Sequence, residues 1–171
     1  VFVQILTVII IFAVPILTLY GLYSYEAFHT TKPRLIMVSV LWGVICFFIA
    51  LFIEDLKLNF FSDRHLLVVI SAPLVEEILK ASFLIFLSWR ISLRYTGDGV
   101  IYGFAIVSGF AIAESLNYAS GNVDPIGTAF IRTISVGMMH GTTTALLGFL
   151  LARMETQTRI ERWSAIALGL L

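Results

Sequence analysis

Charged residues are scarce in this sequence. Only 13% of its 171 residues are Asp, Glu, Lys or Arg, whereas about 25% is usual in a soluble globular chain. The two signs balance, with 11 basic and 11 acidic residues, so the formal net charge is zero. A chain without excess charge has no general electrostatic attraction for nucleic acid or for an anionic membrane surface. We therefore expect no nucleic-acid partner.

Cysteine is almost absent, and so are the patterns typical of strands. Cys46 is the single cysteine, which excludes an intrachain disulfide. It lies within an apolar run, so we expect it to pack as a small apolar side chain against lipid or a neighbouring helix. The sequence also shows no clean alternation of apolar and polar residues, no internal repeat and no low-complexity tract. Helices are the structure that remains.

Long apolar runs are what the sequence has in abundance, with 59% hydrophobic residues. Five runs are long enough to cross a bilayer as helices, and they are roughly 1–25, 34–53, 66–89, 99–120 and 126–152. A further run begins near Trp163 and is cut off at Leu171, and the first residue is not Met, so we expect a piece of a longer protein. The prediction is an all-α, polytopic integral membrane helix bundle with five full spans and a truncated sixth. We expect residues 1–171 to form a single domain with its motif-bearing core at about 66–152.

Basic residues predict the orientation of this bundle. The first, third and fifth connectors, near 26–33, 90–98 and 153–162, contain or adjoin Lys32, Arg34, Arg90, Arg94, Arg153, Arg159 and Arg162. The second and fourth connectors contain Lys57 and Arg64 alone. Because connectors rich in Lys and Arg stay in the cytoplasm, we expect a multi-pass cell-membrane protein with 26–33, 90–98 and 153–162 on the cytoplasmic side. The acidic and basic residues around Glu54 also predict a short interfacial helix in the second connector.

Ionisable residues inside the predicted spans need an explanation. They are Glu76, Glu77, Lys80, Glu114, Arg132 and His140. Each charged residue at the centre of a membrane helix costs about 2.5–3.5 kcal/mol if it faces lipid unpaired. These side chains must therefore face one another, a wet cavity or a metal ion.

Helical spacing limits how these side chains combine. Glu76 and Lys80 are four residues apart and can pair on one helix face, whereas Glu77 points about 100° away from Glu76. One glutamate should therefore take part in the chemistry while the other supports it. Because Lys80 can neutralise Glu76, we prefer Glu77 as the chemical residue.

The other spans also place polar residues on shared faces. His140 shares a face with Thr144 and with Gly137, Gly141 and Gly148, small residues that let another helix approach closely. This approach should bring His140 to a carboxylate of the span 66–89. Glu114 shares its face with Asn117 and Tyr118. At 1.5 Å per residue, the acids and His140 lie roughly 10–20 Å below the outer surface, so we expect one shared layer.

Carboxylates and an imidazole are the ligands of a catalytic zinc ion, with one position left for water. We expect His140 and one glutamate of the pair, Glu76 or Glu77 with Glu77 preferred, together with Glu114, to hold zinc or the attacking water, and the remaining glutamate to act as a general base. Without metal, a desolvated glutamate could activate water directly. Lys80 and Arg132 would adjust the local charge or stabilise an oxyanion.

Simpler roles remain open for several of these residues. Glu76 and Glu77 could form a structural pair neutralised by Lys80 and Arg132, and His140 could be a buried histidine with satisfied hydrogen bonds. Arg132 is more typical of a charge partner than of a chemical group. Asp98 and Asp124 stand at helix entrances and are more typical of helix caps than of catalysis.

Three stretches resemble the sequence blocks of a known family, the PrsW family of intramembrane proteases. They are "APLVEEILK" (72–80), "DGVIYGFAIVSGFAIAESLNY" (98–118) and "RTISVGMMHGTTTALLG" (132–148), in the family's order. By position, the resemblance implies that Glu76 and Glu77 are the paired catalytic acids, Glu114 the acid of the second block and His140 the histidine of the third. The sequence departs from the pattern at Ser115, where the family has asparagine, although Asn117 is near.

The resemblance implies a multi-helix membrane peptidase, usually described as a metalloprotease, that makes the site-1 cleavage of a single-span anti-sigma factor on its outer side. We therefore expect an endopeptidase that cleaves a membrane-anchored protein, with Lys80, Asn117, Arg132 and Thr144 in supporting roles. The wider group also includes prenyl-protein endopeptidases of the CAAX type and bacteriocin-immunity-type proteins. A CAAX-type peptidase and a non-catalytic scaffold or immunity protein are therefore the alternatives.

Overall fold

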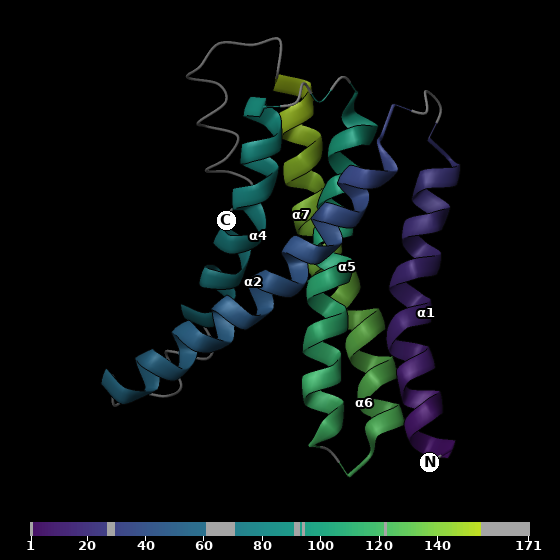
Figure 1. The fold of residues 1–171 in the computed structure, drawn as a ribbon, viewed down its shortest axis with the longest axis vertical. Helices are drawn as coiled ribbons and strands as arrows, with labels where there is room; N and C mark the ends of the chain where they lie inside the picture. The colour runs from purple at the N-terminus through teal and green to yellow at the C-terminus, as the bar shows by residue number, and fades with distance from the viewer. Residues whose placement is uncertain are drawn as a thin grey trace.

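Helices make up the part of the protein that the structure describes. The computed structural model describes residues 2–26, 30–60, 71–90, 93, 95–121 and 123–154. The elements are α1 (Phe2–Ser24), α2 (Pro33–Phe60), α4 (Ala72–Arg90), α5 (Thr96–Ser120), α6 (Pro125–Ile131), the π-helical turn η2 (Arg132–Val136) and α7 (Gly137–Arg153). The last three run on without a break and form one long segment (Figure 1). No strand occurs within these ranges, and the all-α prediction is confirmed.

Four helices of the described ranges are long and apolar enough to cross a membrane. They are Phe2–Ser24, Pro33–Lys57, Thr96–Ser120 and Pro125–Arg153, which confirms a helical membrane bundle. The expected span 66–89 corresponds to α4, whose 19 residues include Glu76, Glu77 and Lys80 and are less apolar for that reason. Residues 66–70 and the run that begins near Trp163 lie outside the described ranges.

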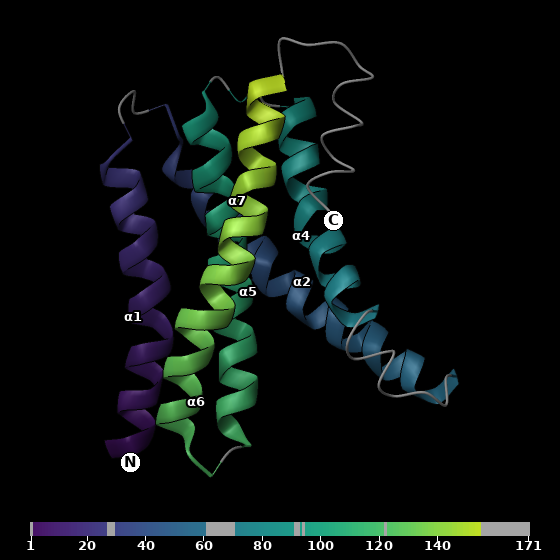
Figure 2. The ribbon, with the colours of Figure 1, turned by 180° about the vertical axis from the view of Figure 1, so that it is seen from behind.

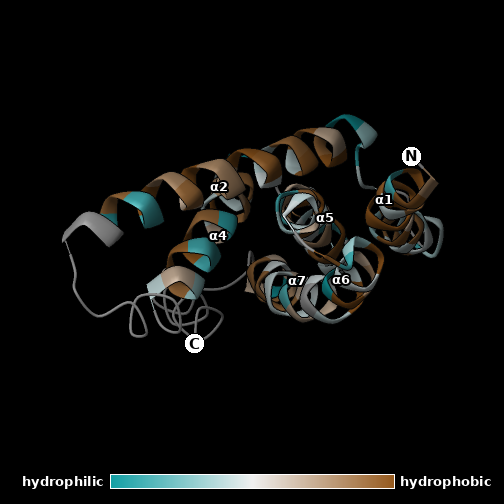
Figure 3. Cartoon of the chain, turned by 90° about the horizontal axis from the view of Figure 1, so that it is seen from below, coloured by the Kyte–Doolittle hydropathy of each residue, from teal (hydrophilic) through white to brown (hydrophobic). Residues whose placement is uncertain are grey.

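Helix α5 stands at the centre of the bundle. Figure 3 shows α1, α2, α6 and α7 around it, with α4 beyond α2 and α7. Glycines permit the closest approaches: a methyl group added to Gly99 or to Gly148 would collide with the backbone of the other, so α5 and α7 touch main chain to main chain. On the opposite face of α5, Gly109 meets the backbone of α2 in the same way. Small residues at such crossings are typical of membrane helices.

Apolar side chains fill the spaces on both sides of α5. One cluster joins α4, α5 and α7 through residues that include Leu84, Ile106 and Leu147. A second joins α2 to α5 and contains Phe110 and Cys46. Cys46 is completely buried, so it packs as a small apolar side chain against a neighbouring helix, as expected.

The helix ends that flank the three connectors with the surplus of basic residues lie at the same end of the bundle. The end of α1, the start of α2, the junction of α4 and α5 and the end of α7 are all at the top of Figure 1 and of the reverse view in Figure 2. The start of α1 and the turn between α5 and α6 are at the bottom. The predicted alternation of the connectors is therefore present. Arg94, Arg159 and Arg162 lie outside the described ranges.

A polar network fastens the α1–α2 connector to the start of α5. Glu26 accepts hydrogen bonds from the backbone N–H groups of Thr30 (2.7 Å) and Thr31 (2.9 Å) and from both threonine hydroxyl groups. The Thr30 hydroxyl also lies 2.5 Å from Asp98 Oδ1. Burial alone would raise the pKa of Glu26, but the hydrogen bonds from Thr31 and Thr30 outweigh it and hold that pKa below its ordinary value of 4.5.

Helix ends follow the local signals of the sequence. Asp124 precedes Pro125 at the start of α6 and accepts a 2.9 Å hydrogen bond from the Gly127 N–H. Asp98 accepts one of 3.3 Å from the Tyr95 N–H in the first turn of α5. Asp124 is therefore the N-cap of α6, as expected, and Asp98 is the third helical residue of a capping box at the start of α5. A separate interfacial helix does not begin at Glu54, because residues up to Phe60 continue α2; residues 61–65 lie outside the described ranges.

Candidate active site

Glu77 of α4 and His140 of α7 meet inside the bundle. The Nδ1 atom of His140 lies 2.7 Å from Glu77 Oε1, although 63 positions separate the two residues in the sequence. Neither is fully buried: 22% of the Glu77 side chain and 15% of the His140 side chain are exposed. The prediction that helix packing brings His140 to a carboxylate of the third span is confirmed.

Both oxygens of the Glu77 carboxylate are surrounded by donors. Oε1 faces the Lys80 ammonium group at 3.0 Å in addition to His140. Oε2 faces the hydroxyl groups of Thr143 and Thr144, each at 3.4 Å. The sequence pointed to Thr144 but not to Thr143, which stands three residues after His140 and donates a 2.9 Å hydrogen bond to its carbonyl oxygen. The i, i+3 spacing to His140 was the signal available.

Lys80 links the two adjacent glutamates. Its ammonium group lies 3.3 Å from Glu76 Oε2 and 3.0 Å from Glu77 Oε1, so the predicted pairing of Glu76 with Lys80 is confirmed. The side chain is completely buried, and its nitrogen lies 3.8 Å from the centroid of the Phe110 ring of α5. Because Lys80 contacts Glu77 more closely than Glu76, its position gives no reason to prefer Glu77 as the chemical residue.

Glu114 and Arg132 form a second ion pair. Arg132 Nη2 lies 2.5 Å from Glu114 Oε1, and the guanidinium carbon lies 3.6 Å from the centroid of the Tyr118 ring. Arg132 is therefore a charge partner, but for Glu114 and not for the Glu76–Glu77 pair. Asn117 is exposed, and within the described ranges its side chain has no hydrogen bond to either group.

The polar residues occupy two levels of the bundle rather than one layer. Arg132 and His140 are eight positions apart on one helical segment, which corresponds to an axial separation of about 10 Å. Glu114 contacts Arg132 at the lower level, and Glu77 contacts His140 at the upper level. The upper level is about 20 Å from either end of the Pro125–Arg153 segment, and so lies near the middle of the membrane.

The small-residue face of α7 meets a different helix from the one expected. Gly148 contacts Gly99 of α5, the backbone of Thr144 faces Gly103, and Gly141 faces the Phe104 ring. The glycines thus seat α7 on α5, while α4 is reached by the side chains of His140, Thr143 and Thr144. Glycines on α7 therefore fix the position of His140 without contacting α4 themselves.

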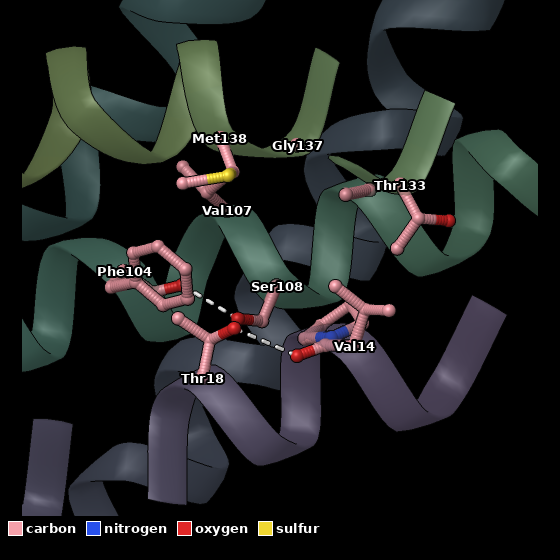
Figure 4. Close-up of a pocket in the computed structure, with 10 residues that line it drawn as sticks. Val14, Thr18, Phe104, Val107, Ser108, Thr133, Gly137 and Met138 are labelled. Carbon is pink, nitrogen blue, oxygen red and sulfur yellow. Dashed lines mark hydrogen bonds between the residues drawn. The ribbon is translucent and has the colours of Figure 1, made fainter. Parts of the chain in front are cut away.

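A small cavity between α1, α5 and the α6–α7 segment is separate from both levels (Figure 4). Its volume of about 10 Å³ is close to that of one water molecule. Ser108 and Thr18 line it, but each donates its hydroxyl hydrogen to a carbonyl of its own helix, at 2.9 Å to Phe104 O and 2.9 Å to Val14 O. None of the ten described residues that line this cavity is an acid, a base or a histidine, so it is not the candidate active site.

The donor types of the upper level suit a metal ion, but the set is not complete. Glu77 and His140 supply a carboxylate and an imidazole, the ligand types of catalytic zinc. Over the residues that the structure describes, no group of three or more His, Cys, Asp or Glu side chains is arranged to hold a metal. Glu114, expected as a third ligand, is bound to Arg132 instead.

Comparisons with known proteins identify the family to which the chain belongs. A model of the family described as "PrsW family intramembrane metalloprotease" matches residues 31–171. Protease PrsW of Bacillus subtilis (strain 168) is 24% identical over 152 residues, which cover 85% of this chain and 68% of that protein. No solved structure matches the chain significantly. The matched region includes every residue of both polar levels, and the chain belongs to the PrsW family of intramembrane metalloproteases.

Proposed function

We propose that this membrane-embedded protease hydrolyses a peptide bond of a membrane-anchored protein at the site formed by Glu76, Glu77 and His140. The observation that carries the proposal is the 2.7 Å contact between Glu77 and His140 near the middle of the membrane. Ionisable groups at that depth are costly and are usually functional. A purely structural role would neutralise the acids with Lys80 alone and would not require a histidine from another helix.

Glu77 orients His140 in this proposal. An ionised carboxylate that accepts a hydrogen bond from Nδ1–H fixes the tautomer and leaves Nε2 free to face the reaction. Glu77 has little capacity for a further role, because Lys80 also contacts Oε1 and two threonine hydroxyl groups face Oε2. Glu77 therefore acts on the substrate through His140.

Glu76 is the better general base. Within the described ranges its one polar contact is with Lys80 at 3.3 Å through Oε2, so Oε1 remains available to water. Glu76 takes a proton from water as the water oxygen attacks the carbonyl carbon of the substrate. It then returns the proton to the amide nitrogen as the C–N bond breaks, which yields a carboxylic acid and an amine. The roles of the two glutamates are thus the reverse of those expected from helical spacing.

Zinc is the metal that we propose for this site, with His140 Nε2 as a donor. When bound, the ion would lower the pKa of its water and polarise the substrate carbonyl. Glu114 has no part in this ligand set because Arg132 holds it at the lower level.

The proposed substrate is a single-span protein of the anti-sigma-factor type, cleaved from the outer side. Two features support this choice. The family relationship implies an intramembrane substrate, and the basic residues Lys32, Arg34, Arg90 and Arg153 gather at one end of the bundle. If that end, which includes 26–33, 90–98 and the start of 153–162, is cytoplasmic, the outer surface is at the Pro125 end of the α6–α7 segment, about 20 Å from the Glu77–His140 level.

A reporter assay tests the proposal. The full chain is reconstituted with a single-span reporter protein, and release of the outer fragment is measured for the parent and for Glu76→Gln, Glu77→Gln and His140→Ala. Each substitution should lower the cleavage rate by about 100-fold or more. Cleavage at the parental rate by the Glu76→Gln or His140→Ala variant would refute the proposed site.

Neighbouring threonines provide a matched control. Thr143→Ala removes a hydroxyl that faces Glu77, whereas Thr142→Ala removes one that donates to the Met138 carbonyl of its own helix. Thr143→Ala should lower the cleavage rate by several-fold, and Thr142→Ala should not change it. In a parallel assay, preference for a farnesylated over an unprenylated peptide would favour the CAAX-type alternative.

A further inference from the structure

The π-helical turn η2 lies between the two polar levels. Its position lets it set the angle between Arg132 and His140 around the axis of the α6–α7 segment. The Gly137 N–H donates to the Arg132 carbonyl, five residues earlier, and to the Ile134 carbonyl, three residues earlier, and not to the carbonyl four residues earlier. Such a turn takes up one extra residue within an otherwise regular α-helix and often occurs at functional sites. Here it begins at Arg132 itself and ends one residue before α7, the helix that carries His140.

Arg132 and His140 contact two different helices beside their segment. Figure 3 shows α5 against the α6–α7 segment, and α4 beside α7 on the flank away from α6. Arg132 reaches Glu114 of α5, and His140 reaches Glu77 of α4. Both contacts can form only if Arg132 and His140 are separated by a particular angle around the axis of their segment.

A regular α-helix would not supply this rotation. Eight steps of about 100° leave Arg132 and His140 about 80° apart around the helix axis. If η2 absorbs one residue, seven effective steps leave them about 20° apart. An 80° rotation of His140 would move its ring away from Glu77, because Gly148 and Thr144 hold α7 against α5 and prevent compensation by the whole helix.

We propose that η2 is a register device: because it absorbs one extra residue, it keeps the Arg132–Glu114 pair aligned with the Glu77–His140 pair. The residues of the turn need not take part in chemistry. The property that matters is the number of effective helical steps between the two levels. This inference concerns geometry and does not depend on the proposed reaction.

Single-residue deletions test the device. Ser135 is exposed within η2, and its deletion should convert the turn to regular α-helix while both ends keep their rotation. The deletion variant should melt in detergent at a temperature no lower than the parent and cleave the reporter within about threefold of the parental rate. An alanine inserted after Ser135 should instead rotate His140 by about 100° and lower the rate by about 100-fold.

Leu146 provides the matched control. It is also exposed, but it lies in the regular part of α7, between His140 and Gly148. Deletion of Leu146 should lower the melting temperature, because Gly148 then turns away from Gly99 and no π turn is present to absorb the change. The proposal is overturned if deletion of Ser135 is as damaging as deletion of Leu146, or if the insertion is tolerated. The melting temperatures decide this even if the reporter is not a substrate.

Discussion

Arg132 donates a hydrogen bond of 2.5 Å to Glu114, and so joins the π turn to the central helix at a level below the Glu77–His140 contact. Each member of this pair is largely buried, with 21% and 11% of the two side chains exposed. The Tyr118 ring covers the guanidinium group. The pair therefore secures the α6–α7 segment, and its loss should be measurable as a loss of stability.

We expect Glu114→Gln to lower the free energy of unfolding by about 2 kcal/mol, because the Arg132 charge is left without a counter-charge in an apolar environment. Unfolding in mixed micelles measures this change. Asn117→Ala, one turn further along the exposed surface of α5, should alter stability by less than about 0.5 kcal/mol. Equal effects of the two substitutions would contradict a structural role for the ion pair.

Lys80→Met should destabilise the protein by about 3–5 kcal/mol, because Glu76 and Glu77 both lose the cation between them. Adding Glu76→Gln to this variant should restore part of the stability, since one of the two uncompensated carboxylates is then removed. The parent, Lys80→Met, Glu76→Gln and the double variant form a double-mutant cycle, which measures the coupling energy between Lys80 and Glu76 directly. A coupling energy of zero would show that Lys80 does not serve the glutamate pair.

Gly148→Ala should lower the free energy of unfolding by about 1–3 kcal/mol or more, because the new methyl group collides with the backbone of Gly99. Gly21→Ala is the control: it also lies inside a helix, but nothing stands within 4 Å of the added methyl group. That substitution should be neutral or stabilise by up to about 1 kcal/mol. The paired melting temperatures test whether α5 and α7 touch main chain to main chain.

The hydrogen-bonded carboxylate of Glu26 should make stability depend on pH at the acid end. Its pKa in the folded protein is lower than the ordinary 4.5, so its contribution is complete above that value and is lost as the pH falls through the folded pKa. The melting temperatures of the parent and of Glu26→Gln should therefore differ most near neutral pH and converge as the pH falls through the folded pKa. A difference that grows on acidification would contradict the assigned hydrogen bonds.

Interactions within one helix were predictable from the sequence. The pairing of Glu76 with Lys80 follows from their i, i+4 spacing, and the caps at Asp98 and Asp124 follow from the chemistry of helix entrances. The apolar runs predicted the helices themselves, because only satisfied backbones are stable in hydrocarbon. Each of these conclusions depends on neighbours along the chain, whose geometry a regular helix specifies.

Contacts between helices were predictable in kind but not in detail. Burial of charges required that Glu114 and His140 find polar partners, yet the sequence did not indicate two separate levels. Which partners Glu114 and His140 find depends on the rotation of α7 about its axis. The η2 turn changes this rotation by about 100°, the angular step of one residue. No residue type marks such a turn in advance, because packing of the flanking helices selects it. Phe110 was missed for a similar reason: its contact with Lys80 depends on how α4 meets α5.

The enclosure of α5 also orders events during biosynthesis. The helices α1 and α2 carry long rows of exposed apolar side chains, so each can enter the bilayer alone. By contrast, α5 brings Glu114 into the membrane 18 positions before its partner Arg132 is synthesised. Until Arg132 emerges from the ribosome, the cost of that acid is uncompensated. We therefore expect the translocon to retain α5 until the α6–α7 segment arrives, and the two to leave it together as one helical hairpin.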